Sequence, residues 1–318
     1  MMSKNLLLFN PGSGQKFIPA IVPEGVRKIP VTVGSVGAEP VLTKLQTTLQ
    51  YLYRAGFRDV EAHVTRDYMD VVDKCKAAVG RRVDTVFVFG GDGTVNAALS
   101  ILRNTGIALG VLPGGTANVF ARFLHIPLTV DDAVSVLQQK RRMKVDIGAC
   151  NGDYFGCVAG MGFDAWVIKH TPQRVRAIIG NLSFIITAFR AIAKYRFKKF
   201  RVIIDDKEFD AFSVIVQNGP YYGGDVVFTP DASLTDGYLD CIVFKDKRVA
   251  TLFHYLWAVR RKQQPDTSRA QIVKARTISI PDTSVYYHLD GEPREKKPVT
   301  ISVEPHALNV YAGEGVKA

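Results

Sequence analysis

The stretch VFVFGGDGTVNAALSIL, residues 86–102, decides how the first half of this sequence is interpreted. Apolar residues typical of a buried strand run into Gly90-Gly91-Asp92-Gly93-Thr94, and an apolar helical pattern follows at once. A strand that meets a helix through glycines exposes backbone N–H groups, and a phosphate can approach them closely. Asp92 would repel a bare phosphate, so the loop favours a metal-bound nucleotide. The alternative is a tight turn in which Asp92 caps the helix at Thr94.

Two more strand–glycine–helix junctions occur in the same part of the chain. Asn10-Pro11-Gly12-Ser13-Gly14 follows a short apolar segment, and Pro113-Gly114-Gly115-Thr116-Ala117-Asn118 follows another. All three loops are expected at the carboxyl ends of parallel strands, the edge at which open α/β sheets bind ligands. None matches the GxxxxGK[ST] loop or a complete GxGxxG. Together they favour a nucleotide site over three unrelated turns.

Strand and helix patterns alternate around these loops, which is typical of parallel βαβ units. Strands are expected at residues 6–9, 60–65, 83–89 and 107–112, and helices at 42–55, 69–79, 94–102 and 116–124. We therefore predict an N-terminal α/β nucleotide-binding domain over residues 1–126, with a parallel, Rossmann-like sheet. Residues 15–40 are rich in Pro, Gly and Val without a clear period, and are interpreted as an irregular insertion.

The pattern changes after residue 126 to short alternating segments separated by turn residues, which predicts strands. These segments are 144–148, 154–159, 200–205, 209–216, 237–244, 276–281, 285–289 and 299–303. They predict a mostly antiparallel β-sandwich domain over residues 127–304, with helices at 174–197 and 248–262. The segment 305–318 is expected to return to the first domain.

The chain has 318 residues and a net charge of +11, which suggests two domains and an anionic partner. Residues 165–204 carry nine basic residues and no acid, and they include a strongly apolar helical pattern. LFHYLWAVRRK, residues 252–262, combines aromatic and basic residues in the same way. Both segments suit an anionic membrane surface, and the alternative is that both helices pack on the sandwich with solvated charges.

Other sequence features narrow the class of protein. The four cysteines form no CxxC pair, so we expect them to be reduced and buried, as in a cytoplasmic protein. No signal peptide and no stretch of about 20 charge-free apolar residues is found, which favours peripheral membrane association. Nucleic-acid binding is not expected, because no RNP, helix-turn-helix or zinc-finger signature occurs. A homodimer is left open.

GGDGTVN, residues 90–96, followed by LPGGTANVFAR, residues 112–122, resembles the diacylglycerol kinase-like lipid kinases. That family includes diacylglycerol, sphingosine, ceramide and bacterial phosphatidylglycerol kinases. NPGSG is similar to its first nucleotide loop, and Thr65 in HVTRD to its threonine after the second strand. PDASLTDGYLD, residues 230–240, and HLDGEP, residues 288–293, resemble its P-x-A-x-x-x-DG and DGE motifs. Each piece alone is weak, whereas the combination in this order is specific.

The resemblance implies transfer of the γ-phosphoryl group of ATP to a lipid hydroxyl, with diacylglycerol or a related lipid as the expected acceptor. Glu292 would be the general base, and Asp92 would orient the metal or the acceptor hydroxyl. A magnesium ion would be held by Asp236 and by main-chain groups of Ser233 and Tyr238. The nucleotide would be lined by Asn10, Pro11, Gly12, Ser13, Gly14, Thr65, Gly91, Asp92, Gly93, Thr94, Val95, Asn96 and Thr116. Both DG pairs, at 236–237 and 290–291, have the alternative of plain hairpin turns.

Three points remain open in the sequence. Ala97 stands where the family usually has a glutamate, so one acid that could contact the ribose or the metal is missing. Asp92 and Glu292 remain, and we expect an active enzyme. NAD kinases also carry GGDGT, but their TPxGSTAY-like loop is not found, which leaves them as the alternative enzyme, beside a non-catalytic membrane-binding module. NGPYYGGD, residues 218–225, either shapes the entry of acyl chains or is a plain surface loop.

Overall fold

The structure is a computed structural model and describes residues 4–12, 31–33, 39–171, 195, 197–261 and 268–316. It divides into two compact units, Met1–Val145 with Ala307–Val316, and Asp146–His306. The chain passes between them within strand β6 (Arg142–Cys150) and within strand β19 (Val299–Tyr311). The first unit extends past the boundary predicted at residue 126. The predicted fold classes, α/β and antiparallel β-sandwich, are confirmed for the two units.

The first unit is built on a parallel sheet. Its strands, in spatial order, are β2 (Val31–Val33), β3 (Val60–Val64), β1 (Asn5–Phe9), β4 (Thr85–Gly90) and β5 (Ala108–Pro113). Every adjacent pair is parallel, and the end of β19 adds to β5 in the same direction. Leu7 of β1 lies opposite Ala62 and Phe87, and all three are fully buried. Because helices cover both faces, the central strands β1, β4 and β5 are almost continuously apolar and buried.

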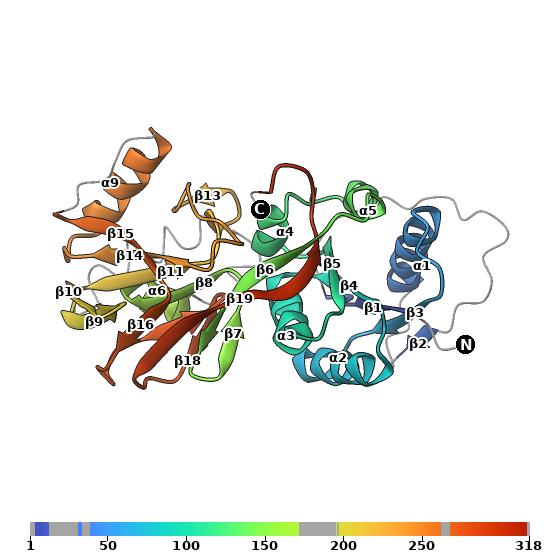
Figure 1. Cartoon of the computed structure of the whole chain (residues 1–318), viewed down its shortest axis with the longest axis horizontal. Coiled ribbons are helices and arrows are strands. Elements are labelled where there is room, and N and C mark those ends of the chain that lie inside the picture. Colours follow the sequence, from blue (N-terminus) through green and yellow to red (C-terminus); the bar gives the residue numbers. More distant parts are fainter. Residues whose placement is uncertain are drawn as a thin grey trace. The chain divides into compact units, whose positions relative to one another are not determined.

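Helices cover both faces of this sheet. They are α1 (Glu39–Arg54), α2 (Tyr68–Arg81), α3 (Asp92–Leu102), α4 (Val119–Phe123) and α5 (Val130–Gln138). α1 packs on α5 and α2 packs on α3, with the sheet between the two pairs (Figure 1). α5 was not expected from the sequence. It packs on β5 and so belongs to the first unit, which extends to Val145.

The connections place a ligand edge between two neighbouring strands. β1 and β4 are adjacent and parallel. The strands that follow β1 in the sequence, β2 and β3, lie on one side of this pair, and the strand that follows β4, β5, lies on the other side. Open α/β sheets bind ligands at such a switch point. The loops after β1 and β4 are the first and second glycine loops of the sequence.

The second unit is a sandwich of two antiparallel sheets. One has the order β15 (Ala270–Ala275), β14 (Leu239–Phe244), β11 (Ser213–Gln217), β8 (Val158–Gly162), β17 (Tyr287–Leu289) and β18 (Glu292–Arg294). The other includes β10 (Lys207–Ala211), β9 (Phe200–Ile204), β16 (Thr277–Ile280) and the start of β19. One apolar core joins them, with Met161 and Val216 from the first sheet and Val202 and Ile278 from the second.

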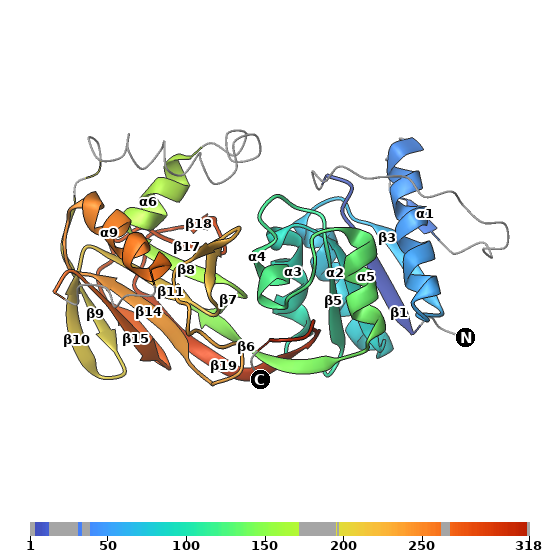
Figure 2. The ribbon, with the colours of Figure 1, turned by 90° about the horizontal axis from the view of Figure 1, so that it is seen from above.

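Shorter elements complete the second unit. They are β7 (Asp153–Phe155), β12 (Tyr221–Gly223), β13 (Val226–Val227), α6 (Phe163–His170) and α9 (Val249–Arg260). α6 and α9 cover the outer face of the β15–β18 sheet (Figure 2). α9 was predicted over residues 248–262, whereas the predicted helix 174–197 lies outside the described residues except for 195 and 197. All four cysteines are free and buried. Within the described part of the chain, no helix is both long and apolar enough to cross a membrane.

Candidate functional site

The three glycine loops of the first unit form one connected structure at the carboxyl ends of β1, β4 and β5. The backbone N–H of Asn10 donates to the Phe89 carbonyl at 2.9 Å, and its side-chain Nδ2 donates to Thr94 Oγ1 at 2.9 Å. The backbone N–H of Gly114 donates to the Gly90 carbonyl at 2.8 Å. The first loop is thus tied to the second, and the second to the third.

Glycines let the second and third loops touch each other. A Cβ atom on Gly115 would lie 2.5 Å from the Cα of Gly91, and one on Gly91 would lie 3.2 Å from the Cα of Gly115. A side chain at either position would therefore push the loops apart. A Cβ atom on Gly93 would meet nothing within 4 Å, so the space beside it is open. One glycine pair serves loop packing, and Gly93 leaves room for a ligand at the start of α3.

Asp92 connects two of these loops through its side chain. It is the first residue of α3, whose N-cap is Gly91. Its Oδ1 accepts a hydrogen bond from the backbone N–H of Phe120 in α4 at 3.2 Å. The carboxylate is half-buried, so part of it still faces solvent beside the open space at Gly93. Asp92 thus fixes the start of α4 and remains accessible for a role in binding.

Asn118 closes the third loop, and the sequence analysis did not single it out as a site residue. Its Oδ1 accepts from the Gly115 N–H at 2.9 Å, and its Nδ2 donates to the Gly115 carbonyl at 2.7 Å. Its φ of +46° is left-handed, a conformation that asparagine adopts more readily than most residues. With these two hydrogen bonds in place, Thr116 is exposed at the tip of the loop. An asparagine at the end of a glycine-rich turn was the signal available in the sequence.

The remaining residues predicted to line the nucleotide take different positions. Thr65 is buried and its hydroxyl donates to the Phe9 carbonyl at 3.3 Å, at the end of β1. Val95 and Asn96 are buried in the first turns of α3. Pro11 is half-buried, and Gly12 is exposed and donates its N–H to Asn10 Oδ1 at 3.0 Å. Ser13 and Gly14 lie outside the described residues.

Ala97, the departure from the family pattern, points into the first unit. It is fully buried in α3. A glutamate placed at this position in the same packing would carry its charge into an apolar environment, which costs free energy unless a partner is present. The alanine therefore suits the local packing of this chain.

In the second unit, the hairpin turn between β17 and β18 presents Glu292. Asp290 and Gly291 have φ values of +47° and +82°, as a two-residue hairpin turn requires. The Asp290 carboxylate accepts three backbone N–H groups, from Gly156 at 2.8 Å, Cys157 at 2.9 Å and Val158 at 2.8 Å. Glu292 is exposed at the start of β18. The turn is a hairpin that is anchored by its aspartate and leaves its glutamate accessible.

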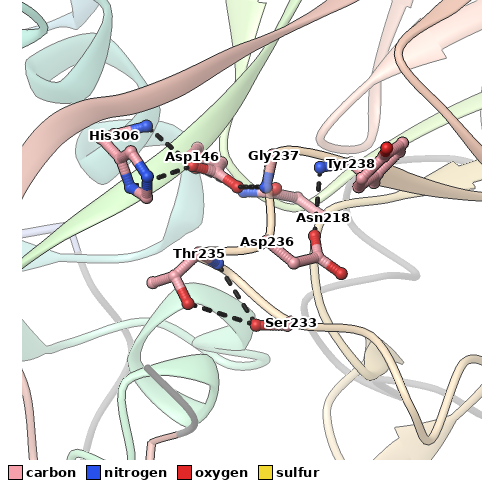
Figure 3. A network of polar contacts seen from close by, with 8 residues as sticks. All are labelled: Asp146, Asn218, Ser233, Thr235, Asp236, Gly237, Tyr238 and His306. Atoms are coloured by element: carbon pink, nitrogen blue, oxygen red, sulfur yellow. Dashed lines mark hydrogen bonds and ion pairs between the residues drawn. The ribbon is translucent and has the colours of Figure 1, made fainter.

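A second turn, residues 233–238, is held by the buried carboxylate of Asp146 (Figure 3). Its Oδ2 accepts from the Gly237 N–H and its Oδ1 from the His306 N–H, both at 2.7 Å. Asn218 Nδ2 donates to the Asp146 carbonyl at 2.8 Å. Asp146 and His306 are the first and last residues of the second unit, so one carboxylate joins its two ends to this turn. The sequence offered no signal for Asp146, an acid within an ordinary strand pattern.

The turn 233–238 carries the residues predicted to hold magnesium. Asp236 Oδ1 accepts from the Tyr238 N–H at 3.0 Å, and Asp236 Oδ2 pairs with the Lys274 ammonium. The hydroxyls of Ser233 and Thr235 lie 3.3 Å apart on the same turn (Figure 3). Such oxygen donors are the kind that magnesium takes. Among the described residues, no group of three or more His, Cys, Asp or Glu side chains could hold a metal ion.

Negative charge exceeds positive charge around Lys274. The pKa of Asp240 is raised to about 6, chiefly by burial and also by the charges of Asp236 and Asp231, while Lys274 opposes the shift. Three carboxylates therefore share one ammonium group. The donor chemistry and the charge fit a hard divalent cation at Asp236, and Lys274 is the group with which such a cation would compete.

Comparisons with known proteins cover both units. Residues 35–150 match the sequence model of the diacylglycerol kinase catalytic domain, and residues 156–312 match that of the YegS C-terminal NAD kinase beta sandwich-like domain. A diacylglycerol kinase of Staphylococcus saprophyticus is 26% identical over 322 residues, covering 100% of this chain and 98% of the relative. A diacylglycerol kinase of Staphylococcus aureus is 29% identical, covering 87% of this chain and 89% of the relative.

The fold comparison agrees with the sequence comparison. A crystal structure of a diacylglycerol kinase from Bacillus anthracis superposes with a TM-score of 0.76 and covers 99% of both chains. The two sequences are 24% identical, so this likeness describes the fold. The order of an α/β unit followed by a sandwich is thus shared along the whole chain.

Proposed function

Because the chain belongs to the diacylglycerol kinase-like family of lipid kinases, we propose that it transfers the γ-phosphoryl group of ATP to the hydroxyl of diacylglycerol or a related lipid. The connected glycine loops at the switch point of the first unit carry the proposal. They bring the start of α3 beside the open space at Gly93. The helix dipole adds a partial positive charge there, which favours a phosphate.

The residues of the first unit would hold the nucleotide by position and charge. Asn10 and Thr94 fix the first two loops relative to each other, and Asn118 fixes the third. Thr116, exposed at the loop tip, is free of the packing that buries its neighbours and would contact the nucleotide. Phosphoryl transfer needs such positioning more than covalent chemistry. Tight loop packing therefore serves catalysis directly.

Magnesium, when bound, would supply positive charge for the phosphates and for the local structure. Asp92 would orient either the nucleotide-bound ion or the acceptor hydroxyl, and Asp236 with main-chain groups of Ser233 and Tyr238 would hold a second, structural ion. The excess negative charge around Lys274 supports the second assignment. These assignments follow the family resemblance.

Glu292 is proposed as the general base. Its carboxylate would take the proton from the acceptor hydroxyl while the oxygen attacks the γ-phosphorus, the bond to the β-phosphate oxygen breaks and ADP leaves. Its exposure at the end of an anchored hairpin supports this role, because the turn is fixed while the side chain is accessible. The Asp290 carboxylate already accepts three backbone N–H groups, so Asp290 is not a candidate for the general base.

The face of α9 that points to solvent supports a membrane surface as the partner. Phe253 is 39% exposed and Trp257 is 48% exposed, one turn apart on the helix. The guanidinium of Arg261 lies 4.2 Å from the centre of the Trp257 ring. On the opposite face, buried Tyr255 donates to the Phe228 carbonyl at 2.6 Å, so α9 packs on its unit with one side only. Exposed aromatic and basic residues together suit the interface of an anionic bilayer.

An acceptor panel tests the proposal. The purified chain is incubated with γ-labelled ATP and magnesium, with diacylglycerol, phosphatidylglycerol, ceramide or sphingosine in mixed micelles, and with NAD in parallel. We expect a labelled lipid and no labelled NADP. Labelled NADP would support the alternative enzyme, since the second unit also matches a domain described as NAD kinase-like. A folded protein that labels none of these acceptors would reject the kinase proposal.

A further inference from the structure

A chain of hydrogen-bonded side chains in the second unit, with the buried His288 at its centre, ends at the hairpin that carries Glu292. The Nε2 atom of His288 lies 2.8 Å from Oδ2 of Asp164, and the Tyr222 hydroxyl donates to Oδ1 of the same carboxylate. The Nδ1 atom of His288 lies 3.2 Å from the backbone nitrogen of Gly291. His288 is fully buried on β17, while Asp164 lies in the first turn of α6 and Tyr222 on β12. Three elements distant in sequence thus meet at one turn.

Each link of this chain has a fixed direction. The backbone N–H of Gly291 can only donate, so Nδ1 of His288 accepts, and the proton of the neutral ring lies on Nε2. Nε2 therefore donates to Asp164. Burial, together with the neighbouring Asp164 carboxylate, raises the pKa of Tyr222 well above its ordinary value, so the phenol keeps its proton and donates as well. Asp164 accepts from both sides.

The His288–Asp164 pair fits into the fold because the facing residue, Gly160, has no side chain. Gly160 of β8 lies directly opposite His288 in the sheet. A Cβ atom on Gly160 would lie 1.9 Å from Oδ2 of Asp164 and 2.2 Å from Nε2 of His288. Burying a carboxylate and an imidazole also costs desolvation free energy, and apolar residues could fill the same volume. Stability alone therefore does not explain why a histidine and an aspartate are paired here.

We propose that His288, Asp164 and Tyr222 are positioning residues that hold the turn of Gly291 and thereby aim Glu292. Tyr222 belongs to the segment 218–225, for which the sequence left a role at the acyl chains of the acceptor open. The chain of hydrogen bonds joins this segment to the turn that presents the base. The proposal rests on the proposed function, because it needs Glu292 to act in the reaction.

Two substitutions of His288 separate positioning from stability. In His288→Asn the amide oxygen reaches the place of Nδ1 and can accept from Gly291, while Asp164 loses a donor. In His288→Gln the amide nitrogen reaches the place of Nε2 and donates to Asp164, while Gly291 loses its acceptor. We expect His288→Gln to lower kcat about tenfold or more with an unchanged KM for ATP, since a misplaced catalytic group costs up to about 100-fold. We expect His288→Asn, which keeps the acceptor for Gly291, to lower kcat only about threefold, although its Tm falls further.

The two readouts are kcat with the lipid and Tm by thermal unfolding, on the full chain. Values of kcat that follow Tm in both variants, or an unchanged kcat in His288→Gln, would overturn the positioning role. Tyr222→Phe, which removes one donor to Asp164, should lower kcat about threefold, whereas Tyr286→Phe removes a hydroxyl outside the chain and should leave kcat unchanged. A wild-type chain that phosphorylates no lipid would instead reject the proposed function, before any variant is compared.

Discussion

The glycine loops of the first unit and the two turns of the second unit are fixed in different ways. The loops are held by backbone groups and short polar side chains from the loops themselves, such as Asn10, Thr94 and Asn118. The turns are held by particular side chains: the buried Asp146 of β6 holds the turn 233–238, and the hairpin is held by its own Asp290 and by the buried His288 of β17. The loops therefore depend on the absence of side chains at glycines, and the turns depend on particular side chains being present.

Because of this difference, substitutions in the loops and in the turns should affect different properties of the protein. In the loops, added volume should separate backbone segments and weaken nucleotide binding while the unit stays folded. In the turns, loss of an anchor should leave buried donors without acceptors and lower the stability of the second unit. Glu292 is the exception there, because it is exposed and anchors nothing that would affect stability.

The largest effect is expected for Glu292→Gln. If Glu292 takes the proton of the acceptor hydroxyl, kcat should fall by a factor of about 100–10,000, the typical contribution of a general base. The Tm should stay unchanged because the side chain is exposed. Glu295→Gln, just after the other end of β18 and also exposed, is the matched control and should keep full activity. Equal rates for the two variants would remove Glu292 from the mechanism.

Gly115→Ala should affect nucleotide binding next most strongly. Its Cβ atom would lie 2.5 Å from the Cα of Gly91, so the second and third loops must separate. We expect KM for ATP to rise about tenfold or more, which corresponds to about 1.4 kcal/mol of lost binding. Gly80→Ala is the control, since a Cβ there meets nothing within 4 Å and lies within α2. An unchanged KM in Gly115→Ala would contradict loop contact as a requirement for binding.

Asp146→Asn should lower the stability of the protein while kcat is retained, the reverse of the result expected for Glu292→Gln. An amide would keep one acceptor but present an N–H group to one of the two backbone donors, Gly237 or His306. We expect the free energy of unfolding to fall by about 2–3 kcal/mol, the cost of a buried donor left unsatisfied. Urea unfolding measures it. Asp206→Asn, exposed and at a φ of +69° that asparagine tolerates, should change little.

The same difference decides what the sequence could reveal. The alternation of strands and helices and the three glycine loops are local patterns, so the parallel sheet and its ligand edge could be predicted. Glycine contacts between loops, and the clasp of Asn118 on Gly115, were not foreseen, because they depend on which loops meet in space. Asp146, Asp164 and His288 bind groups more than 50 residues away or on other strands, and a single acid in a strand gives no sign of such a partner. α5 was missed although Thr129 and Asp132 form a recognisable helix start.

Asp240→Asn tests the charge balance of the turn that carries Asp236, with the smallest expected effect. The pKa of Asp240 is raised to about 6 from 3.8, so its ionisation costs more in the folded state than in the unfolded chain. Below about pH 4 the group is protonated in both states and this penalty is absent; it grows between pH 4 and 6 and is complete above pH 6. The amide variant should therefore be more stable than wild type at pH 7.5 and equal to it at pH 4.

The expected gain at pH 7.5 is about 1 kcal/mol, below the roughly 3 kcal/mol that a two-unit shift implies, because Lys274 loses an ionic neighbour. Thermal unfolding at the two pH values measures it. Magnesium offers a second readout, since a cation at Asp236 would relieve the same repulsion and should stabilise wild type more than Asp240→Asn. A variant that is destabilised at pH 7.5 would show that Lys274 already balances the three carboxylates, and the turn would then depend on its side-chain anchors alone.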